Sequence, residues 1–171
     1  SVVKAVSVPV EVKISKYFSC PLSLIARLRQ TGAKGVTLFN RSYRMDVDVE
    51  KEAITTGNIF TEPQDIADTL RYVGIAAAEL KDFPVSASTG VHGYICALKA
   101  LLVGAQTVQM CSSLYKNGVD QVQRTLAGIE EWMERKQYRS IDEFRGKLKA
   151  AEEDQALYGR MQFMRYFSEA E

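Results

Sequence analysis

The strongest constraint on the fold of this chain is a unit of one short strand followed by one helix, which occurs four times in 171 residues. The predicted strands cover residues 9–15, 35–39, 84–88 and 106–110, and they are rich in apolar and β-branched side chains. A strand, a helix and a further strand joined by short links imply parallel strands with right-handed crossovers. Parallel strands of this composition are expected to be buried on both faces. Four such units make half of a (β/α)8 barrel, so the pattern predicts an α/β fold of that kind.

The predicted helices each carry apolar residues at the spacing of one helical face. These faces are Leu22, Ile25 and Leu28; Ile66, Leu70, Val73 and Ala77; Ile95, Leu98, Leu101 and Leu102; and Val122, Leu126, Ile129 and Met133. Residues 41–60 interrupt the repeat, and residues 45–50 alternate as a half-buried strand does. We expect residues 54–60 to return as the partner strand, which makes a small hairpin inserted at the mouth of the barrel.

The repeat ends near residue 140, and the remaining chain predicts two short helices. Ile141, Phe144 and Leu148 mark the first, whereas Leu157 and Met161 mark the second. We therefore divide the chain into a half barrel, residues 1–150, and a helical tail, residues 151–171. The aromatic residues of the tail are expected to pack on the barrel or on a partner.

Charge and composition narrow the classes of partner. Lys and Arg number 22 and Asp and Glu 21, so a net charge of +1 offers no electrostatic case for nucleic acid. No apolar run is long enough to span a bilayer. The cysteines Cys20, Cys96 and Cys111 are far apart, which fits free thiols and a cytoplasmic location. A zinc site is not expected, because His92 is the single histidine that could join them. The chain opens at Ser1 without a methionine, so we expect residues upstream.

Small residues follow the last two predicted strands, as Thr89-Gly90 and as Cys111 with Ser112-Ser113. Glycine lets a backbone approach an anion closely, and helix N-termini direct N–H groups toward it. In (β/α)8 barrels a phosphate site often lies on the loops after strands seven and eight. The sequence therefore predicts a phosphate-bearing ligand and identifies the four units as the second half of a barrel.

Two further polar residues lie on the first two strands. Lys13 interrupts an apolar strand, where it either meets an anion or an electron-rich cofactor inside the barrel or reaches solvent. Asn40 ends the second strand, where it either binds substrate or bonds its own backbone in a turn. Arg41 and Arg44 are candidates for a substrate carboxylate or are solvated. His92 is more typical of a first-turn residue than of a catalyst.

Five ordered segments resemble the C-terminal half of the dihydroorotate dehydrogenase family, over roughly residues 8–148. They are VKISKYF at 12–18, FNRS at 39–42, TGVHG at 89–93, VQMCSSLYKNG at 108–118 and SIDEFRGKL at 140–148. The resemblance implies an FMN-dependent (β/α)8 barrel of pyrimidine biosynthesis. It also implies that a hydride passes from dihydroorotate, or from a similar small molecule with a CH–CH bond, to the flavin.

The resemblance also implies roles for single residues. Lys13 would contact the pyrimidine end of the flavin, where a positive charge stabilises its reduced form. Asn40 would hydrogen-bond the substrate, while Gly90 and the backbone of Ser112 and Ser113 would hold the phosphate. Thr89 and Cys111 stand where the family usually has glycine, and backbone donors survive both changes. Arg41 replaces a residue that is more often small, which leaves the substrate open.

The catalytic base of this family, a cysteine or serine of the first half, has no counterpart here, so this chain alone is expected to be inactive. Half a barrel leaves two open edges. Either the chain belongs to a longer one, or two copies join as a homodimer.

Fumarate, NAD and quinone stay open as electron acceptors. The alternatives are a phosphate-binding isomerase or aldolase with Lys13 as a Schiff-base residue, or a non-catalytic assembly protein with the aromatic tail as its docking surface.

Overall fold

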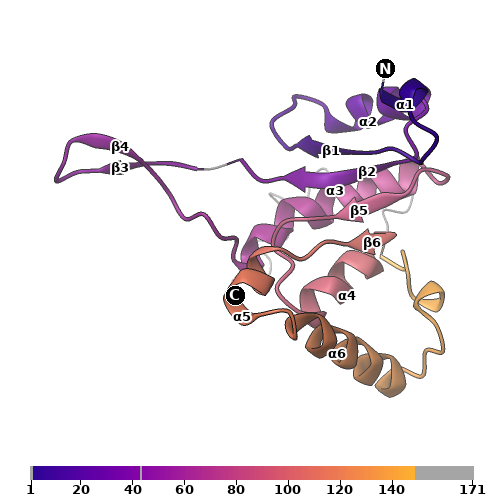
Figure 1. Cartoon of the computed structure of the whole chain (residues 1–171). Coiled ribbons are helices and arrows are strands. Elements are labelled where there is room, and N and C mark those ends of the chain that lie inside the picture. Colours follow the sequence, from indigo (N-terminus) through magenta and orange to yellow (C-terminus); the bar gives the residue numbers. More distant parts are fainter. Residues whose placement is uncertain (1, 43, 149–171) are drawn as a thin grey trace, which may run out of the picture.

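The computed structural model describes residues 2–42 and 44–148 (Figure 1). The predicted tail, 151–171, lies outside the described residues. None of the helices within these ranges is long and apolar enough to cross a membrane. In chain order the elements are α1 (Val2–Ala5), β1 (Glu11–Ser15), α2 (Pro21–Gln30), β2 (Gly35–Asn40), β3 (Met45–Asp48), β4 (Ala53–Thr56), η1 (Pro63–Asp65), α3 (Ile66–Glu79), β5 (Val85–Ala87), α4 (Tyr94–Leu102), β6 (Thr107–Val108), α5 (Ser112–Asn117), α6 (Gln121–Arg135) and η2 (Ile141–Glu143).

The main sheet has four strands in the order β1-β2-β5-β6. All three neighbouring pairs are parallel, with Val12 opposite Val36 in the first pair and Ala87 opposite Val108 in the last. The predicted strands and their parallel order are therefore confirmed. The sheet does not close within the described residues, because β1 and β6 each have a neighbouring strand on one side only.

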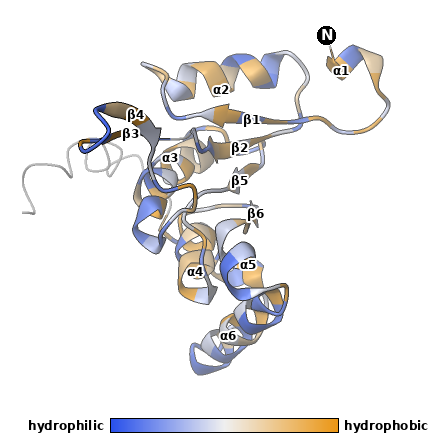
Figure 2. Cartoon of the chain, turned by 60° about the vertical axis from the view of Figure 1, so that its left-hand side comes forward, coloured by the Kyte–Doolittle hydropathy of each residue, from blue (hydrophilic) through white to orange (hydrophobic). Residues whose placement is uncertain are grey.

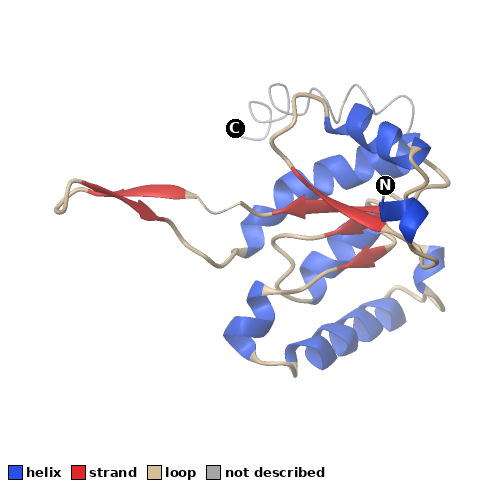
Figure 3. Ribbon diagram, turned by 45° about the horizontal axis from the view of Figure 1, so that its top comes forward, coloured by secondary structure: helices blue, strands red, loops and turns tan. Residues whose placement is uncertain are grey.

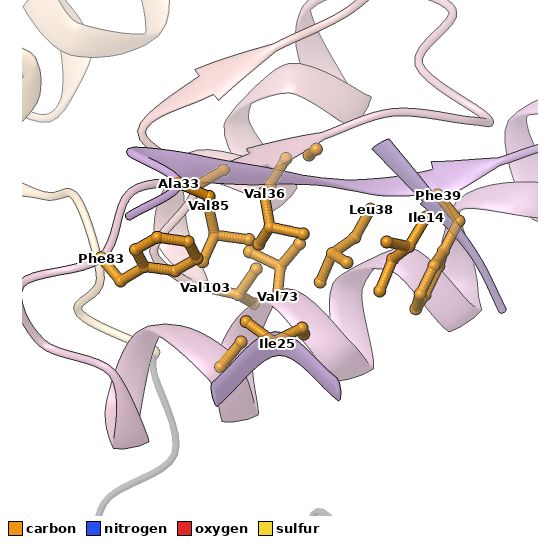
Figure 4. Close-up of a cluster of buried hydrophobic side chains, with 14 residues drawn as sticks. Ile14, Ile25, Ala33, Val36, Leu38, Phe39, Val73, Phe83, Val85 and Val103 are labelled. Atoms are coloured by element: carbon orange, nitrogen blue, oxygen red, sulfur yellow. The ribbon is translucent and has the colours of Figure 1, made fainter. Parts of the chain in front are cut away.

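Helices α2, α3 and α4 cover one face of this sheet (Figure 3). The strands contribute alternate apolar side chains to that face, as period-two geometry requires. Val36 and Leu38 of β2 are fully buried, and they pack in one cluster with Ile25 of α2 and Val73 of α3 (Figure 4). This cluster is the hydrophobic core that holds the strand ends in place.

The opposite face of the sheet is polar. The expectation that the strands are buried on both faces is confirmed for β2, up to its last residue, and for β5, but it is wrong for the edge strands β1 and β6. Lys13, Thr37 and Ser86 lie on that face, together with Thr107 and Gln109. Thr37 and Ser86 are buried, whereas Lys13 and Gln109 are exposed. In complete (β/α)8 barrels the corresponding face points into the barrel and is usually filled with bulky branched residues. The polar residues on this face therefore differ from the usual pattern.

A second apolar cluster joins α4, α6 and the segment after η2. Phe144 is fully buried, and its ring centroid lies 5.0 Å from that of Trp132. The N–H of Gly146 donates to the carbonyl of Leu101 at 2.9 Å. The short helix expected from residue 141 is thus a single 3-10 turn, which packs against α4 and α6.

Not every predicted apolar face is buried. On α6, Ile129 is 7% exposed, whereas Val122 is 42% and Leu126 54% exposed. On α4, Ile95 is 49% exposed. Periodicity showed that these residues share a face but not whether that face meets another element.

Strands β3 and β4 pair antiparallel, with Val47 opposite Ile54. The predicted hairpin is therefore confirmed, and it extends away from the sheet (Figure 1). Its strands carry both hydrophobic and hydrophilic residues (Figure 2). The half-buried environment expected for it is wrong, because Met45 is 71% and Ile54 is 77% exposed. The apolar members of the alternating segment, Met45, Val47 and Val49, are therefore exposed in this structure.

Candidate functional site

A pocket of about 190 Å³ lies where β2, β5 and β6 end, and six of the seven predicted site residues line it. These six are Lys13, Asn40, Thr89, Gly90, Cys111 and Ser112. Ser113 is the exception, because its side chain is fully buried and its hydroxyl donates to the carbonyl of Val91 at 3.2 Å. Parallel strands bring their carboxyl ends to one edge of the sheet, which is why residues so far apart in the sequence meet here.

Lys13 extends over the polar face of the sheet toward this pocket. Its Nζ lies 3.0 Å from Oγ of Ser88 and 3.3 Å from Oε1 of Gln109. An ammonium has three N–H donors, so these two contacts with described residues leave one donor for a ligand.

Asn40 ends β2 at the border between two pockets. Its side chain makes no hydrogen bond within residues 2–42 and 44–148, so both its donor and its acceptor are available. Arg41 beside it is already engaged, because its guanidinium donates to the carbonyls of Asn58 and Ile59 at the end of the hairpin. Arg41 lines both pockets, and these two hydrogen bonds tie its guanidinium to the segment after the hairpin.

The loop after β5 has an unusual backbone. Thr89 has φ +81°, a region that β-branched residues rarely adopt, and its hydroxyl donates to the carbonyl of Phe39 at 2.8 Å. Gly90 has φ +77°, and a Cβ there would lie 2.3 Å from the backbone nitrogen of Ile66. The close backbone approach expected at Gly90 therefore exists, but it is an approach to the start of α3. Packing alone requires this glycine, whatever the pocket binds.

The loop after β6 is tied to the segment that follows the hairpin. Oγ of Ser112 accepts a hydrogen bond from the N–H of Thr61 at 2.9 Å. The hydroxyl of Thr61 lies 2.9 Å from Nε2 of His92. Partial burial, and then the charge of Lys116, lower the pKa of His92, so its ring is neutral near pH 7. His92 does not line the pocket, and its contacts fit a structural role.

A neighbouring pocket of about 170 Å³ lies on the other side of Asn40. Two of its three cations are paired with carboxylates, because Lys16 contacts Asp68 and Arg44 lies 2.9 Å from Asp65. The third, Arg41, donates to two backbone carbonyls. This pocket is therefore a weaker candidate for an anionic ligand than the pocket beside Lys13.

The sequence analysis missed Gln109, which lines the pocket and holds the ammonium of Lys13. The signal was present, because Thr107 and Gln109 alternate with Val108, just as Glu11 and Lys13 alternate with Val12. Polar side chains at every second position on two strands of one sheet indicate a polar face. The sequence analysis missed this face because it judged the strands by their overall apolar composition.

The donor set of the pocket suits an anionic group and a ring that carries carbonyl and N–H groups. One ammonium N–H and one free amide stand near two loops of small residues. Sites for drug-sized ligands typically measure about 300–1,000 Å³, so a pocket of about 190 Å³ has room for a phosphate-sized group or for one part of a larger ligand. No group of three or more potential metal ligands occurs among the described side chains.

The comparisons with known proteins agree with the ordered motifs. The chain is 32% identical over 111 residues to a dihydroorotate dehydrogenase (fumarate) of Saccharomyces bayanus, which is 60% of this chain and 34% of that protein. The same shares and identity hold for the dihydroorotate dehydrogenase (fumarate) of Saccharomyces cerevisiae. Dihydroorotate dehydrogenase A (fumarate) of Lactococcus lactis is 30% identical over 94 residues, 55% of this chain and 29% of that protein.

No protein-family model matches the chain. The alignment spans about a third of the length of the relatives named above. The predicted resemblance is confirmed over this part: the chain is similar to a portion of the dihydroorotate dehydrogenases, with an α/β structure built on a parallel sheet.

Proposed function

We propose that this chain is the FMN-binding part of an oxidoreductase of the dihydroorotate dehydrogenase type. The observation that carries the proposal is that six predicted site residues meet in one pocket. The similarity to dihydroorotate dehydrogenases over 111 residues supports it independently. When bound, FMN would supply the hydride acceptor for oxidation of a CH–CH bond.

The residues of the pocket divide into three roles under this proposal. Lys13 directs its remaining N–H toward a carbonyl or ring nitrogen of the flavin, and its charge favours the reduced form. Asn40 hydrogen-bonds a dihydroorotate-like substrate through its free amide. Thr89, Gly90, Cys111 and Ser112 form the small-residue wall that receives the phosphate.

The names of the relatives support a choice among the possible electron acceptors. Each relative above is named as a dihydroorotate dehydrogenase that uses fumarate. Of the three acceptors left open by the sequence, we therefore favour fumarate. Flavin and substrate together exceed a pocket of about 190 Å³, so their remaining contacts and the catalytic base would come from strands that complete the sheet.

A direct test is the visible absorption spectrum of the purified chain, followed by titration with FMN monitored by fluorescence quenching. We expect binding that Lys13→Met weakens about tenfold or more, because the charged hydrogen bond is lost. Lys16→Met is the matched control, since Lys16 pairs with Asp68 outside this pocket and its loss should leave FMN affinity unchanged. A colourless protein that fails to quench FMN would contradict the proposal for this chain. Borohydride trapping of a carbonyl substrate at Lys13 would then favour the isomerase or aldolase alternative.

A further inference from the structure

Four hydrogen bonds cross the open face of the sheet and meet at Lys13. They link β1 and β2 with Ser88, directly after β5, and Gln109, directly after β6. The hydroxyl of Thr37 donates to Oε1 of Glu11 at 2.6 Å, and Nε2 of Gln109 donates to Oγ1 of Thr37 at 3.1 Å. Oε1 of Gln109 then accepts from Nζ of Lys13 at 3.3 Å, and the same Nζ donates to Ser88 at 3.0 Å.

The direction of the two hydrogen bonds at Thr37 follows from Glu11. A carboxylate only accepts hydrogen bonds, so the single proton of the Thr37 hydroxyl must point toward it. The oxygen of Thr37 is then left as an acceptor, which selects the NH₂ end of the Gln109 amide. The carbonyl end of that amide consequently faces Lys13, where it meets an ammonium that can only donate.

Glu11 and Lys13 are the sole acidic and basic residues of the four strands of the main sheet. They lie two residues apart on one strand and point to the same face. No direct ion pair joins them within the described part of the chain. Their opposite charges are connected through Thr37 and Gln109 instead, and Thr37 is only 2% exposed, which protects the central link from water.

We propose that Glu11 is a positioning residue, which orients the Gln109 amide through Thr37 and thereby holds the Lys13 ammonium at the edge of the pocket. Its relevance to flavin binding rests on the function proposed above. The relay itself is a property of the chain, and it explains why polar residues occupy a face that complete barrels usually fill with branched apolar ones.

The test compares three variants with the wild-type chain. Thr37→Val keeps the shape of the side chain and removes the link, whereas Thr37→Ser retains the hydroxyl. Glu11→Met keeps a side chain of similar length and removes the acceptor. Without ligand, the side-chain N–H signals of Gln109 are followed by ¹⁵N NMR. We expect their solvent exchange to accelerate about tenfold in Thr37→Val and Glu11→Met, but less than twofold in Thr37→Ser. FMN affinity should fall about tenfold in Thr37→Val and Glu11→Met and stay near the wild-type value in Thr37→Ser.

The two measurements separate the relay from the proposed function. If Gln109 exchange and FMN affinity both stay at wild-type values in Thr37→Val and Glu11→Met, the relay is overturned, even where Lys13→Met still weakens FMN binding. If the wild-type chain binds no FMN, the proposed function fails, and NMR alone decides the relay by the same criterion. If Thr37→Val does not fold, the variant at the exposed Glu11 decides.

Discussion

At the scale of single residues, the backbone conformation at position 90 and its close contact with α3 require glycine. It has φ +77°, and an added Cβ would lie 2.3 Å from the backbone nitrogen of Ile66. We expect Gly90→Ala to lower the free energy of unfolding by about 3 kcal/mol, through left-handed strain and steric overlap together. The measurement is urea denaturation followed by circular dichroism.

Gly118 is the matched control for this substitution, because it also has φ +77° but nothing lies within 4 Å of an added Cβ. Gly118→Ala should cost less, about 2 kcal/mol, from backbone strain alone, because φ +77° with ψ 174° is a region that residues other than glycine rarely adopt. Equal losses in the two variants would show that contact with the start of α3 does not contribute, and would leave the pocket as the reason for Gly90.

His92 predicts how stability depends on pH. Its pKa is lowered by burial, so the folded state resists protonation more than the unfolded state does. The unfolded chain then binds more protons, and stability rises with pH in this range. The contribution of His92 is fully present above about pH 6.5, the ordinary pKa, and is lost as the pH falls toward the lowered value.

His92→Gln tests this, because glutamine retains a partner for the Thr61 hydroxyl, which lies 2.9 Å from the histidine ring. We expect the free energy of unfolding to fall less between pH 7 and pH 5 in the variant than in the wild type. Identical slopes would mean that other groups carry the pH dependence.

At the scale of elements, the segment around η2 is held by aromatic packing. Phe144 is fully buried, and its ring lies 5.0 Å from Trp132 and 5.4 Å from Tyr138. Phe144→Ala should lower the free energy of unfolding by about 3–5 kcal/mol, because it leaves a cavity between α4 and α6. Leu126→Ala on α6 is the control, since Leu126 is 54% exposed and its loss should cost about 0.5 kcal/mol or less. Both values come from chemical denaturation, and similar losses would argue that α6 is covered along its whole length.

At the scale of the whole molecule, the sheet has two edges without partner strands among the described residues. Unpaired backbone groups and a polar inner face favour pairing with further strands. We expect this chain, isolated at micromolar concentration, to associate into multiples of its 19.1 kDa mass. Light scattering measures this directly, and a clean monomer would exclude a second copy as the element that completes the sheet.

Local pattern was sufficient for the elements and their order. Strand and helix periods, proline and glycine positions and short links place β2, α3 and the hairpin at the predicted residues. The same patterns placed the candidate ligand-binding residues at the carboxyl ends of strands, because parallel order follows from the connections. The ordered motifs carried the family resemblance.

Only the tertiary structure decided which faces are covered and which polar groups meet. The hairpin, and Val122 and Leu126 of α6, are exposed because burial depends on a second surface, which periodicity within one element does not encode. The relay from Glu11 to Lys13 joins residues up to 98 positions apart, and strand register alone brings them within hydrogen-bond distance. The sequence by itself determined the kind and order of the elements, because those depend on neighbouring residues. Contacts between elements determined the chemistry of the site, because those depend on how the elements meet in space.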